Sequence, residues 1–346
     1  MGRRVLITGL GTFWGSRVAQ ALEADPEIDV IVGLDRHEPT VPLERTEYVR
    51  SDESYSILAR IVKAAKIDTI VHTFLVVDST QMRSRTIHEI NVIGTMNLFA
   101  AASAPGSTVR NVVVKSSTLV YGANPKDPVW FSEESRRAQP PKAMVERSLL
   151  EVEGYVRDFA VDNPHVNVAM LRFSNVLGPD ITTPLAKALE LPLVPSVFGF
   201  DPRFQFVHEL DVVRAILFVL NGRVQGIYNV AGDGLLPWSE VAAICGKRTV
   251  PLPPFGMGLL SGPFGRLGVD LPPELLDLLR HGRGVDNRRL KKVGFDYRYT
   301  SAGTVADFVE ALRIRRLVGD GQAAYQYERD VEQFFRHSPA VVGDHD

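Results

Sequence analysis

The first 172 residues alternate short apolar runs with longer stretches of helical spacing, and this alternation constrains the fold more than any other feature. The apolar runs are RVLIT (4–8), DVIVGL (29–34), TIVHT (69–73), NVVVKS (111–116) and VNVAMLR (166–172). Helical spacing separates them at about residues 15–24, 54–65, 84–103 and 143–160. Strands that are apolar on both faces and are joined by helices are typical of parallel sheets covered on both sides. The sequence therefore predicts an α/β chain with a doubly wound parallel sheet.

Beyond Arg172 the alternation weakens and prolines become frequent, although GIYNVAG (226–232) predicts one late strand of the sheet. We expect a sheet domain of residues 1–172 plus about 204–230, interleaved with a smaller substrate lobe of about 173–203 and 231–314. Residues 315–346 are expected to add a C-terminal helix and a tail. The stretch 250–284 is rich in Pro, Gly and Leu, which predicts an irregular cap. An alternative for this stretch is a partner-binding or peripheral membrane surface, because exposed apolar patches mark interfaces.

Composition narrows the function classes. A net charge of −2 over 346 residues lacks the basic footprint of nucleic-acid binding. No apolar run of about 18 residues occurs, and the N-terminus enters a strand pattern without a signal segment. Cys245 is the single cysteine, so it cannot form an intramolecular disulfide, and we interpret it as a packing residue. We expect a cytoplasmic protein with no membrane-spanning segment.

A glycine-rich turn follows the first predicted strand. TGLGTFWG, Thr8 to Gly15, leads directly into a helix, where backbone N–H groups can approach a pyrophosphate. The second predicted strand ends in GLDR, which places Asp35 twenty residues past Gly15, where a carboxylate can accept hydrogen bonds from an adenosine ribose. Arg36 could instead hold the 2′-phosphate of NADP. We predict NAD as the cofactor, with NADP as the alternative.

Further motifs follow along the chain in a fixed order. They are YVRSD (48–52), IVHT (70–73), NVIGTMNLFAAA (91–102), KSSTLVYG (115–122), LRFSNVLGP (171–179), FQFVHELDVVRAI (204–216), YNVAGD (228–233) and VDNRRLKKVGF (285–295). Over roughly residues 3–314 the chain resembles the extended short-chain dehydrogenase/reductases, the NAD-dependent epimerase/dehydratase group that includes UDP-galactose 4-epimerase. Within that group it is most similar to mycobacterial-type UDP-glucose 4-epimerase-like proteins. The resemblance implies a Rossmann-type sheet, hydride transfer with NAD, a nucleotide-sugar-like substrate and a homodimer built from the helices at about 84–103 and 143–160.

The resemblance also implies roles for individual residues. Those expected to bind the cofactor are Gly9, Gly11, Thr12, Phe13, Trp14, Gly15, Asp35, Arg36, Asp52, Thr73, Phe74, Leu75, Asn91, Lys115, Ser116 and Arg147. Those expected to bind the substrate are Ser117, Asn175, Arg203 and Arg289, with Arg288 as an alternative to Arg289. Thr12 replaces the middle glycine of the family motif, which changes the loop's shape without abolishing dinucleotide binding.

The catalytic pair of the family is absent. Family members use a tyrosine as the proton-transfer group and a lysine four residues later, and this spacing puts both on one helix face. None of the nine tyrosines has a lysine at that distance. An alignment on LEVEGYVRDF places Ala143 and Arg147 at the two positions. Arg147 cannot act as a base, but it could hold a ribose and keep positive charge near the cofactor, and we expect it to belong to a rearranged proton relay with Ser117.

Ser117, which matches the family's catalytic Ser/Thr, and Tyr121 are therefore candidates for a rearranged proton relay, together with the neighbouring Glu133 and Glu134. The competing interpretation makes Tyr121 a packed aromatic and the two glutamates solvated or capping groups. His208 is interpreted as structural, and no metal-ligand pattern occurs. Two functions stay open: an epimerase, dehydratase or reductase of a nucleotide sugar, which we favour, and a degenerate dinucleotide-binding scaffold or redox-sensing subunit.

Overall fold

The centre of the molecule is a parallel β-sheet. The structure is a computed structural model that describes residues 2–80, 82–222, 224–253 and 272–318. Within these ranges the main sheet has seven strands in the order β11-β6-β5-β4-β1-β2-β3. The strands are β1 (Arg3–Thr8), β2 (Ile28–Asp35), β3 (Thr46–Arg50), β4 (Thr69–His72), β5 (Asn111–Ser117), β6 (Asn167–Phe173) and β11 (Gly226–Val230). All six neighbouring pairs are parallel, so the predicted sheet is confirmed.

The strand order reverses between β1 and β4, which pair with each other in the middle of the sheet. Open α/β sheets bind ligands in the crevice at such a reversal, outside the carboxyl ends of the strands. The late strand predicted at 226–232 is β11, which pairs with β6. β3 is not among the predicted strands, because its residues TEYVR are polar in part and none of them is buried.

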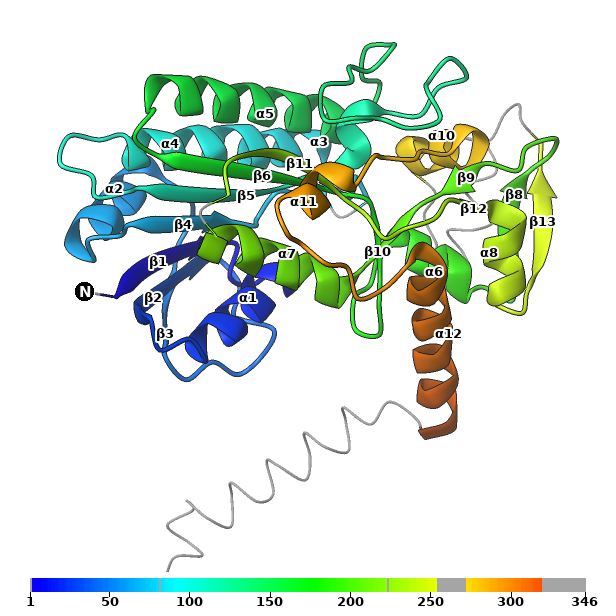
Figure 1. Cartoon of the computed structure of the whole chain (residues 1–346), viewed down its shortest axis with the longest axis horizontal. Helices are drawn as coiled ribbons and strands as arrows, with labels where there is room; N and C mark the ends of the chain where they lie inside the picture. Colours follow the sequence, from blue (N-terminus) through cyan, green and yellow to red (C-terminus); the bar gives the residue numbers. More distant parts are fainter. Residues whose placement is uncertain (1, 81, 223, 254–271, 319–346) are drawn as a thin grey trace, which may run out of the picture.

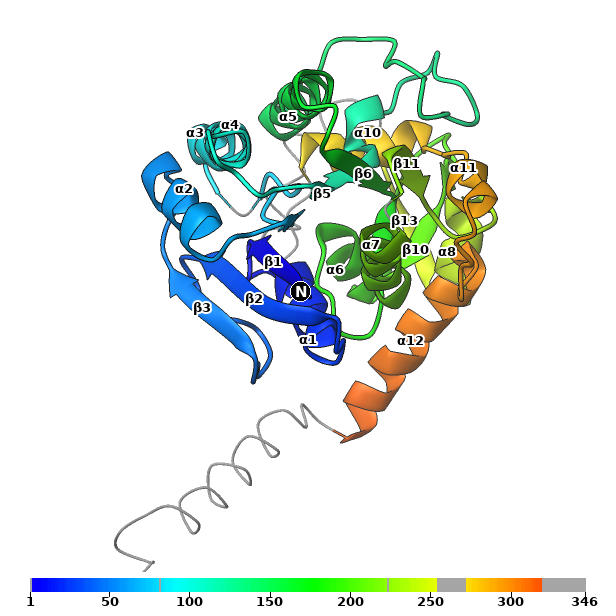
Figure 2. The same cartoon turned by 60° about the vertical axis from the view of Figure 1, so that its left-hand side comes forward.

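Helices cover both faces of the sheet, as Figures 1 and 2 show. One face carries α2 (Tyr55–Ala64), α3 (Ser84–His88), α4 (Gly94–Ala102) and α5 (Met144–Asp162), and the other carries α1 (Phe13–Glu23) and α7 (Glu209–Gly222). Successive strand residues alternate between the two cores, because side chains of a strand point to opposite faces. Val112 and Val114 of β5 pack on the α5 side, whereas Val113 packs on the α1 and α7 side.

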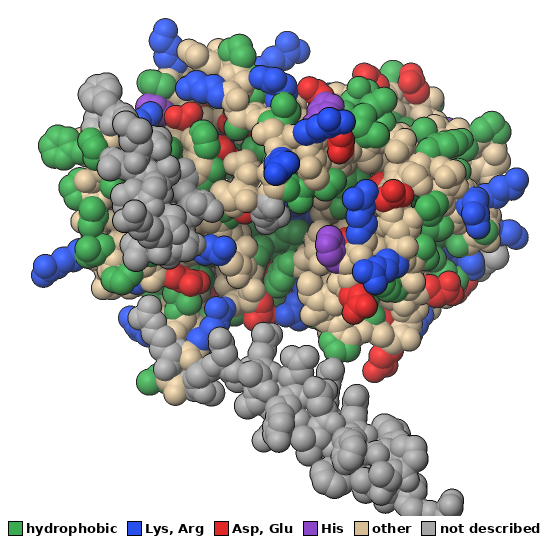
Figure 3. Space-filling model, turned by 180° about the vertical axis from the view of Figure 1, so that it is seen from behind, with side chains coloured by type: hydrophobic (Ala, Val, Ile, Leu, Met, Phe, Trp, Pro, Cys, Tyr) green, Lys and Arg blue, Asp and Glu red, His purple; other side chains and the backbone are tan. Residues whose placement is uncertain are grey.

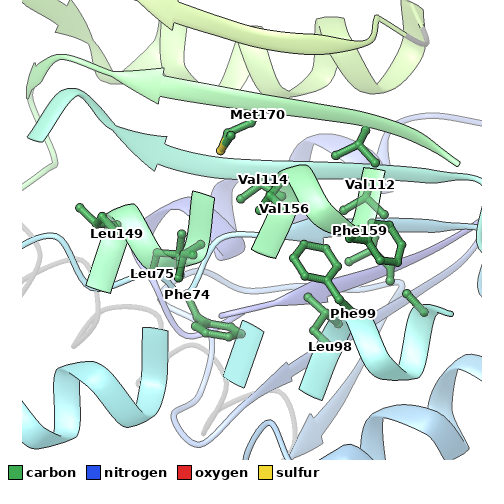
Figure 4. Packing of buried hydrophobic residues seen from close by; sticks show 14 of the residues in the cluster. Phe74, Leu75, Leu98, Phe99, Val112, Val114, Leu149, Val156, Phe159 and Met170 are labelled. Carbon is green, nitrogen blue, oxygen red and sulfur yellow. The ribbon is translucent and has the colours of Figure 1, made fainter. Parts of the chain in front are cut away.

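The apolar stripe of α5 faces the sheet. Its residues are buried, and they are Val145, Leu149, Val152, Val156 and Phe159. Figure 4 shows part of this core, with Val156 beside Val114 of the sheet and Phe159 beside Val112 and Phe99. The helix at about 143–160 therefore has the packing role that its spacing predicts.

The single helix predicted at about 84–103 is interrupted. A π-helical turn, η1 (Glu89–Ile93), separates α3 from α4. Such turns occur often at functional sites. Here the turn contains Asn91, whose side chain is buried and directed at the loop after β4.

A second, smaller core lies beyond the carboxyl ends of the strands. It is built from α6 (Pro184–Glu190), α8 (Trp238–Ile244), α10 (Pro273–His281) and α12 (Ser301–Val318). Its short strand pairs are β7 (Asn175–Leu177) with β10 (Phe206–His208), β8 (Leu193–Val197) with β13 (Arg248–Leu252), and β9 (Arg203–Phe204) with β12 (Leu236–Pro237). The single turn η2 (Thr118–Tyr121) follows β5, and α11 (Arg288–Lys292) contacts β11. Cys245 is buried in this core, as expected for a packing residue. The predicted domain boundaries stay a prediction.

The irregular cap predicted at 250–284 is wrong for the part that is described. Residues 250–252 belong to β13, and residues 273–281 form α10 because Leu275, Leu278 and Leu279 give it an apolar face. Residues 254–271 lie outside the described residues, and so does the predicted C-terminal helix and tail after residue 318. No helix in the described ranges is long and apolar enough to cross a membrane. The face in Figure 3 carries acidic and basic side chains intermixed.

Candidate cofactor and active site

A cavity of about 510 Å³ lies at the carboxyl edge of the sheet, where the strand order reverses. Its walls come from the β1–α1 turn, the segments after β2 and β4, the end of β5 and the start of β7. The start of α6 and the inner face of α10 close it from the side of the second core. The cavity therefore lies between the two cores of the molecule.

The glycine turn after β1 leaves no room for side chains. Gly9 has a φ of +81°, and a Cβ there would lie 2.6 Å from the backbone of Phe74. A Cβ on Gly15 would lie 2.0 Å from the carbonyl oxygen of Gly9. Because both residues are glycines, the start of α1 can lie close to the end of β1, and the backbone itself forms this wall of the cavity. That is the cradle that a pyrophosphate requires.

Thr12 explains the departure from the usual glycine motif. It is the N-cap of α1: its Oγ1 accepts from the N–H of Gly15 at 3.1 Å and donates to the carbonyl of Gly9 at 2.7 Å. Thr12, Phe13 and Trp14 line the cavity at the helix start. The first turn of a helix carries N–H groups without an intrahelical acceptor, so this turn can bind an anion.

Asp35 lies at the end of β2 and lines the same cavity. Its carboxylate accepts from the N–H of Gly11 at 3.0 Å and from the N–H of His37 at 2.9 Å, which fixes its orientation. Arg36 also lines the cavity but is exposed, with Asp52 at 3.8 Å. Asp52 is itself outside the lining residues. The fixed carboxylate suits a free ribose hydroxyl, and it would repel the phosphate of NADP.

Asn91 positions the wall that follows β4. Its Oδ1 accepts from the N–H of Val76 at 2.7 Å, and its Nδ2 donates to the carbonyl of Val76 at 2.8 Å. Thr73 is tied to β1 by a 2.8 Å hydrogen bond to the carbonyl of Thr8. The cavity is lined by Thr73, Phe74 and Leu75, and Asn91 is not among the lining residues. Asn91 thus fixes the position of the loop after β4, which lines the cavity.

Three polar residues in a row, Lys115, Ser116 and Ser117, line the cavity at the end of β5. Ser116 turns toward α5, where its hydroxyl donates to Glu153 Oε1 at 3.0 Å. Ser117 accepts from the N–H of Leu119 at 3.2 Å. Lys115 is only 5% exposed, and burial lowers its pKa to about 8.

Arg147 is not part of the cavity. It is exposed on the solvent side of α5, and Ala143 is the N-cap of that helix. Each helical residue turns the side chain by about 100°, so Arg147 faces away from Val145, two residues earlier. The inward positions spaced four apart are Val145 and Leu149, both fully buried and apolar. Arg147 therefore lies outside the cavity, and its role in place of the family lysine at the cofactor stays a prediction.

Tyr121 also lies outside the cavity lining. Its hydroxyl accepts from Arg172 Nη1 at 2.6 Å and lies 2.7 Å from Asn229 Oδ1. Its ring stacks on Phe131 with centroids 4.6 Å apart. Burial raises the pKa of Tyr121, which is the opposite of what a base at neutral pH requires. The packed-aromatic interpretation describes this residue better than the catalytic one.

The two glutamates are likewise outside the cavity. Glu133 is buried and accepts from the N–H of Asn229 at 2.9 Å, and burial raises the pKa of Glu133. Glu134 is exposed and pairs with Arg289 at 2.6 Å. Arg289 and Arg288 lie beside these glutamates in a separate small depression. Arg289 is therefore not at the candidate substrate position that the resemblance implies.

The substrate-side wall contains groups that sequence reasoning missed. Of the predicted residues, Asn175 and Ser117 line the cavity, while Arg203 is exposed and does not. Arg283, Glu274 and Ser174 line it instead. Each is at least nine-tenths buried and has one polar atom with no hydrogen-bond partner in the described chain: Nε, Oε2 and Oγ, respectively. No motif marks them, because they come from α10, the segment after it and the residue after β6.

Burial shifts the pKa values of two of these groups. It lowers the pKa of Arg283 to about 10 and raises the pKa of the Glu274 carboxyl. One Nη of Arg283 donates to the carbonyl of Gly122 at 2.9 Å, and Ser79 donates to Glu274 Oε1. Arg283 can therefore bind an anionic group, and Glu274 can bind a hydroxyl.

His208 has a structural environment. It is buried, its Nε2 lies 3.0 Å from Asp307, and its ring stacks on Tyr299 with centroids 3.8 Å apart. Across the described part of the chain no group of three or more His, Cys, Asp or Glu could hold a metal ion.

Comparisons with known proteins place this geometry in context. The model of the family described as NAD dependent epimerase/dehydratase matches residues 5–231. An uncharacterized protein of Mycobacterium tuberculosis (strain ATCC 25618 / H37Rv) is 33% identical over 312 residues, which cover 88% of this chain and 82% of the relative.

Two solved structures share the fold. MoeE5 in complex with UDP-glucuronic acid and NAD is similar with a TM-score of 0.69 at 24% identity, over 90% of this chain and 99% of that chain. The UDP-glucose 4-epimerase of Thermotoga maritima with UDP-glucose is similar with a TM-score of 0.69 at 18% identity and the same coverage.

Proposed function

This chain belongs to the NAD dependent epimerase/dehydratase family, and we propose that it binds NAD and oxidises or reduces a sugar carbon of a nucleotide sugar. The observation that carries the proposal is a glycine cradle and a set of polar side chains that line one cavity. The cradle fits a dinucleotide, and the polar side chains, which include Arg283, fit a polar, partly anionic second molecule.

The residues that would hold the cofactor are those of the cradle and its neighbours. The N–H groups at the start of α1 would face the pyrophosphate, and Asp35 would accept from the adenosine ribose. Thr73, Phe74 and Leu75, fixed from behind by Asn91, would form the floor. When bound, the nicotinamide supplies a hydride acceptor or donor.

The residues that would hold the substrate are Ser117, Asn175, Ser174, Glu274 and Arg283. Arg283 would pair with a phosphate or carboxylate oxygen, since a guanidinium binds such groups well. The two solved structures named above contain UDP-glucuronic acid or UDP-glucose, which carry both a diphosphate and sugar hydroxyls. We therefore place a nucleoside diphosphate sugar in this cavity.

The test has two stages. NADH binding is measured by calorimetry and by nicotinamide fluorescence, and we expect saturable binding at one site per chain. The protein is then incubated with NAD and a panel of UDP- and dTDP-sugars, and reduced nicotinamide and epimerised or dehydrated sugar are followed by absorbance and NMR. A protein that binds NADH but converts no sugar of the panel contradicts the proposal.

A second function is favoured by one observation. The inward positions of α5 spaced four apart are the apolar Val145 and Leu149, so this helix presents no proton-transfer group to the cavity. A dinucleotide-binding scaffold or redox-sensing subunit needs the cofactor wall and no proton transfer. It predicts NADH binding, no turnover and a change in a partner interaction or in the protease cleavage pattern between NAD and NADH.

We also retain the homodimer as part of the proposal. Ile93 and Met96 near the start of α4 and Tyr155 of α5 are large apolar side chains exposed to solvent in the single chain, at 45%, 40% and 38%. Light scattering should give twice the chain mass, and a double replacement of Met96 and Tyr155 by Glu should give the mass of one chain.

A further inference from the structure

Lys115 is a buried lysine without an ionic partner. It lines the cavity at the end of β5, it is 5% exposed, and no hydrogen bond or ion pair to it occurs among the described residues. The buried Arg172 differs in this respect, because it forms a 2.6 Å ion pair with Glu153, which is fully buried. Burying a charge without a partner is costly, so a lysine kept in this state calls for a functional explanation.

The orientation of Lys115 follows from the strand. Side chains at i and i+2 on a strand point to the same face, so Lys115 and Ser117 share one side of β5. Ser116, between them, points the other way and bonds to Glu153 of α5. Lys115 therefore lies on the same side of β5 as Ser117, which matches the family's catalytic Ser/Thr, and both line the cavity.

The groups around Lys115 do not neutralise it. On β4, His72 is held between the hydroxyls of Thr8 and Thr95, and burial together with Lys115 lowers the pKa of His72 to about 3, so this ring is uncharged. On β6, Arg172 is committed to Glu153. The other titratable or charged residues that line the cavity are Asp35, Arg36, His37, Glu53, Asp78, Glu274 and Arg283.

We propose that Lys115 is the proton-transfer residue of this protein and takes the place of the missing tyrosine. The proposal rests on the proposed function, because it requires a sugar hydroxyl and a nicotinamide in the same cavity. In the oxidative direction the neutral Nζ of Lys115 takes the proton of the hydroxyl, so an N–H bond forms and the O–H bond breaks. The carbon loses its hydrogen with both electrons to the oxidised nicotinamide, and C–O becomes C=O. Two hydrogens leave the sugar, and they are found on the lysine and on the reduced cofactor.

Burial gives Lys115 the property that such a group needs. Lysine ordinarily titrates near 10.4, whereas a pKa of about 8 leaves about one molecule in ten neutral at pH 7. A base works best when its pKa is near the working pH. Here the apolar surroundings lower the pKa of the lysine.

The experiment compares full-length wild type with Lys115→Met, Lys115→Arg and Lys115→Ala, and with Lys142→Met as the matched control. Lys142 is an exposed lysine at the start of α5, 3.6 Å from Asp277 and outside the cavity lining. NADH affinity and the thermal transition of each variant show whether the fold and the cofactor site persist. Single-turnover reduction of bound NAD by the active sugar of the panel then reports proton transfer.

We expect kcat to fall by about 10²–10⁴ in all three Lys115 variants, as for loss of a general base, with little change in NADH affinity. Lys142→Met should behave as wild type. Added methylamine should restore part of the rate of Lys115→Ala only, because a small amine can occupy the space of the missing side chain. The wild-type rate should rise with pH to a plateau with an apparent pKa near that of Lys115.

A readout independent of turnover is the titration of Lys115 itself. Isotope-labelled lysine gives a Cε NMR resonance that is assigned by its disappearance in Lys115→Arg. We expect its midpoint near pH 8, and a midpoint at the ordinary lysine value overturns the proposal. Full rates in Lys115→Met also overturn it while leaving the proposed function intact. A wild type that binds NADH but converts no sugar overturns both.

Discussion

The two walls of the cavity differ in how their residues are held. On the side proposed to bind the cofactor, close packing or two hydrogen bonds fix each of Gly9, Thr12 and Asp35, and Asn91 holds the loop after β4 from outside the cavity. On the opposite side, Ser117 and Asn175 line the cavity as the resemblance implies, whereas Arg203 and Arg289 do not, and Ser174, Glu274 and Arg283 line it in addition. Under the proposed function, cofactor binding and proton transfer therefore depend on separate sets of residues.

The largest expected effect is on the cofactor wall. Gly15→Ala puts a Cβ 2.0 Å from the Gly9 carbonyl oxygen, so the glycine turn must move. We expect NADH affinity to fall by about 1,000-fold, which corresponds to about 4 kcal/mol. Calorimetry measures it. Gly154→Ala is the matched control, because a Cβ there meets nothing within 4 Å, and unchanged binding in Gly15→Ala would mean that the cradle does not hold the cofactor.

The next effect is a gain in stability, and it concerns Lys115 at the end of β5. Lys115→Met should raise the free energy of unfolding, because the charged lysine is buried without a partner. The pKa difference between 10.5 and about 8 corresponds to about 3 kcal/mol as an upper limit. Urea unfolding of wild type and variant measures the difference.

The sign of the pH dependence follows from the direction of the pKa shift. The folded-state pKa lies below the unfolded value, so the unfolded chain binds more protons between about pH 8 and about pH 10.5. Wild-type stability therefore rises with pH in this window, and the advantage of Lys115→Met is largest below about pH 8 and shrinks above it. A variant that is less stable than wild type at every pH would show that Lys115 has a partner that stabilises it.

A smaller effect, on stability alone, is expected for the buried Tyr121 of η2. Tyr121→Phe removes the hydroxyl that contacts Arg172 and Asn229, and leaves these buried groups short of a partner. We expect a loss of about 2 kcal/mol in the free energy of unfolding, with NADH affinity and turnover unchanged. Chemical denaturation and the turnover assay separate the two. Loss of turnover with full stability would restore Tyr121 as a catalytic candidate.

The smallest effect is expected for Arg147→Ala. The side chain is exposed on the far side of α5, so both the free energy of unfolding and NADH binding should change by less than about 0.5 kcal/mol. A clear loss of NADH affinity in this variant would show that α5 turns Arg147 toward the cofactor in the bound state.

The sequence predicts the sheet and the cofactor wall because both depend on local patterns. The apolar runs predict strands, and the glycine turn and Asp35 predict the cofactor site, from residues that are close together in the sequence. The α5 stripe from Val145 to Phe159 is also predicted correctly, and it already contains the inward pair Val145 and Leu149. Arg147 lies off that stripe, so the spacing that predicts the packing also argues against its catalytic position.

The substrate wall could not be predicted in this way. Glu274 and Arg283 reach the cavity from α10 and the segment after it, which follow β11, the last strand of the predicted sheet. Glu274 and Arg283 line the same cavity as Ser174 only because of the way the second core packs, and no local sequence pattern predicts that packing. The resemblance implies that Lys115 lies at the cofactor. Its lack of an ionic partner depends on which distant residues fold around it, so the sequence does not predict it.

We propose that proton transfer in this chain takes place at the end of β5, whereas the family's proton-transfer pair lies on the helix that corresponds to α5. A crystal structure with NADH and the active nucleotide sugar tests it most directly. We predict that Lys115 Nζ and Ser117 Oγ are the polar atoms within hydrogen-bond reach of the reacting sugar oxygen, with Arg147 in solvent. A structure that places Lys115 away from the sugar, or brings Tyr121 or Arg147 to the nicotinamide, would contradict the claim.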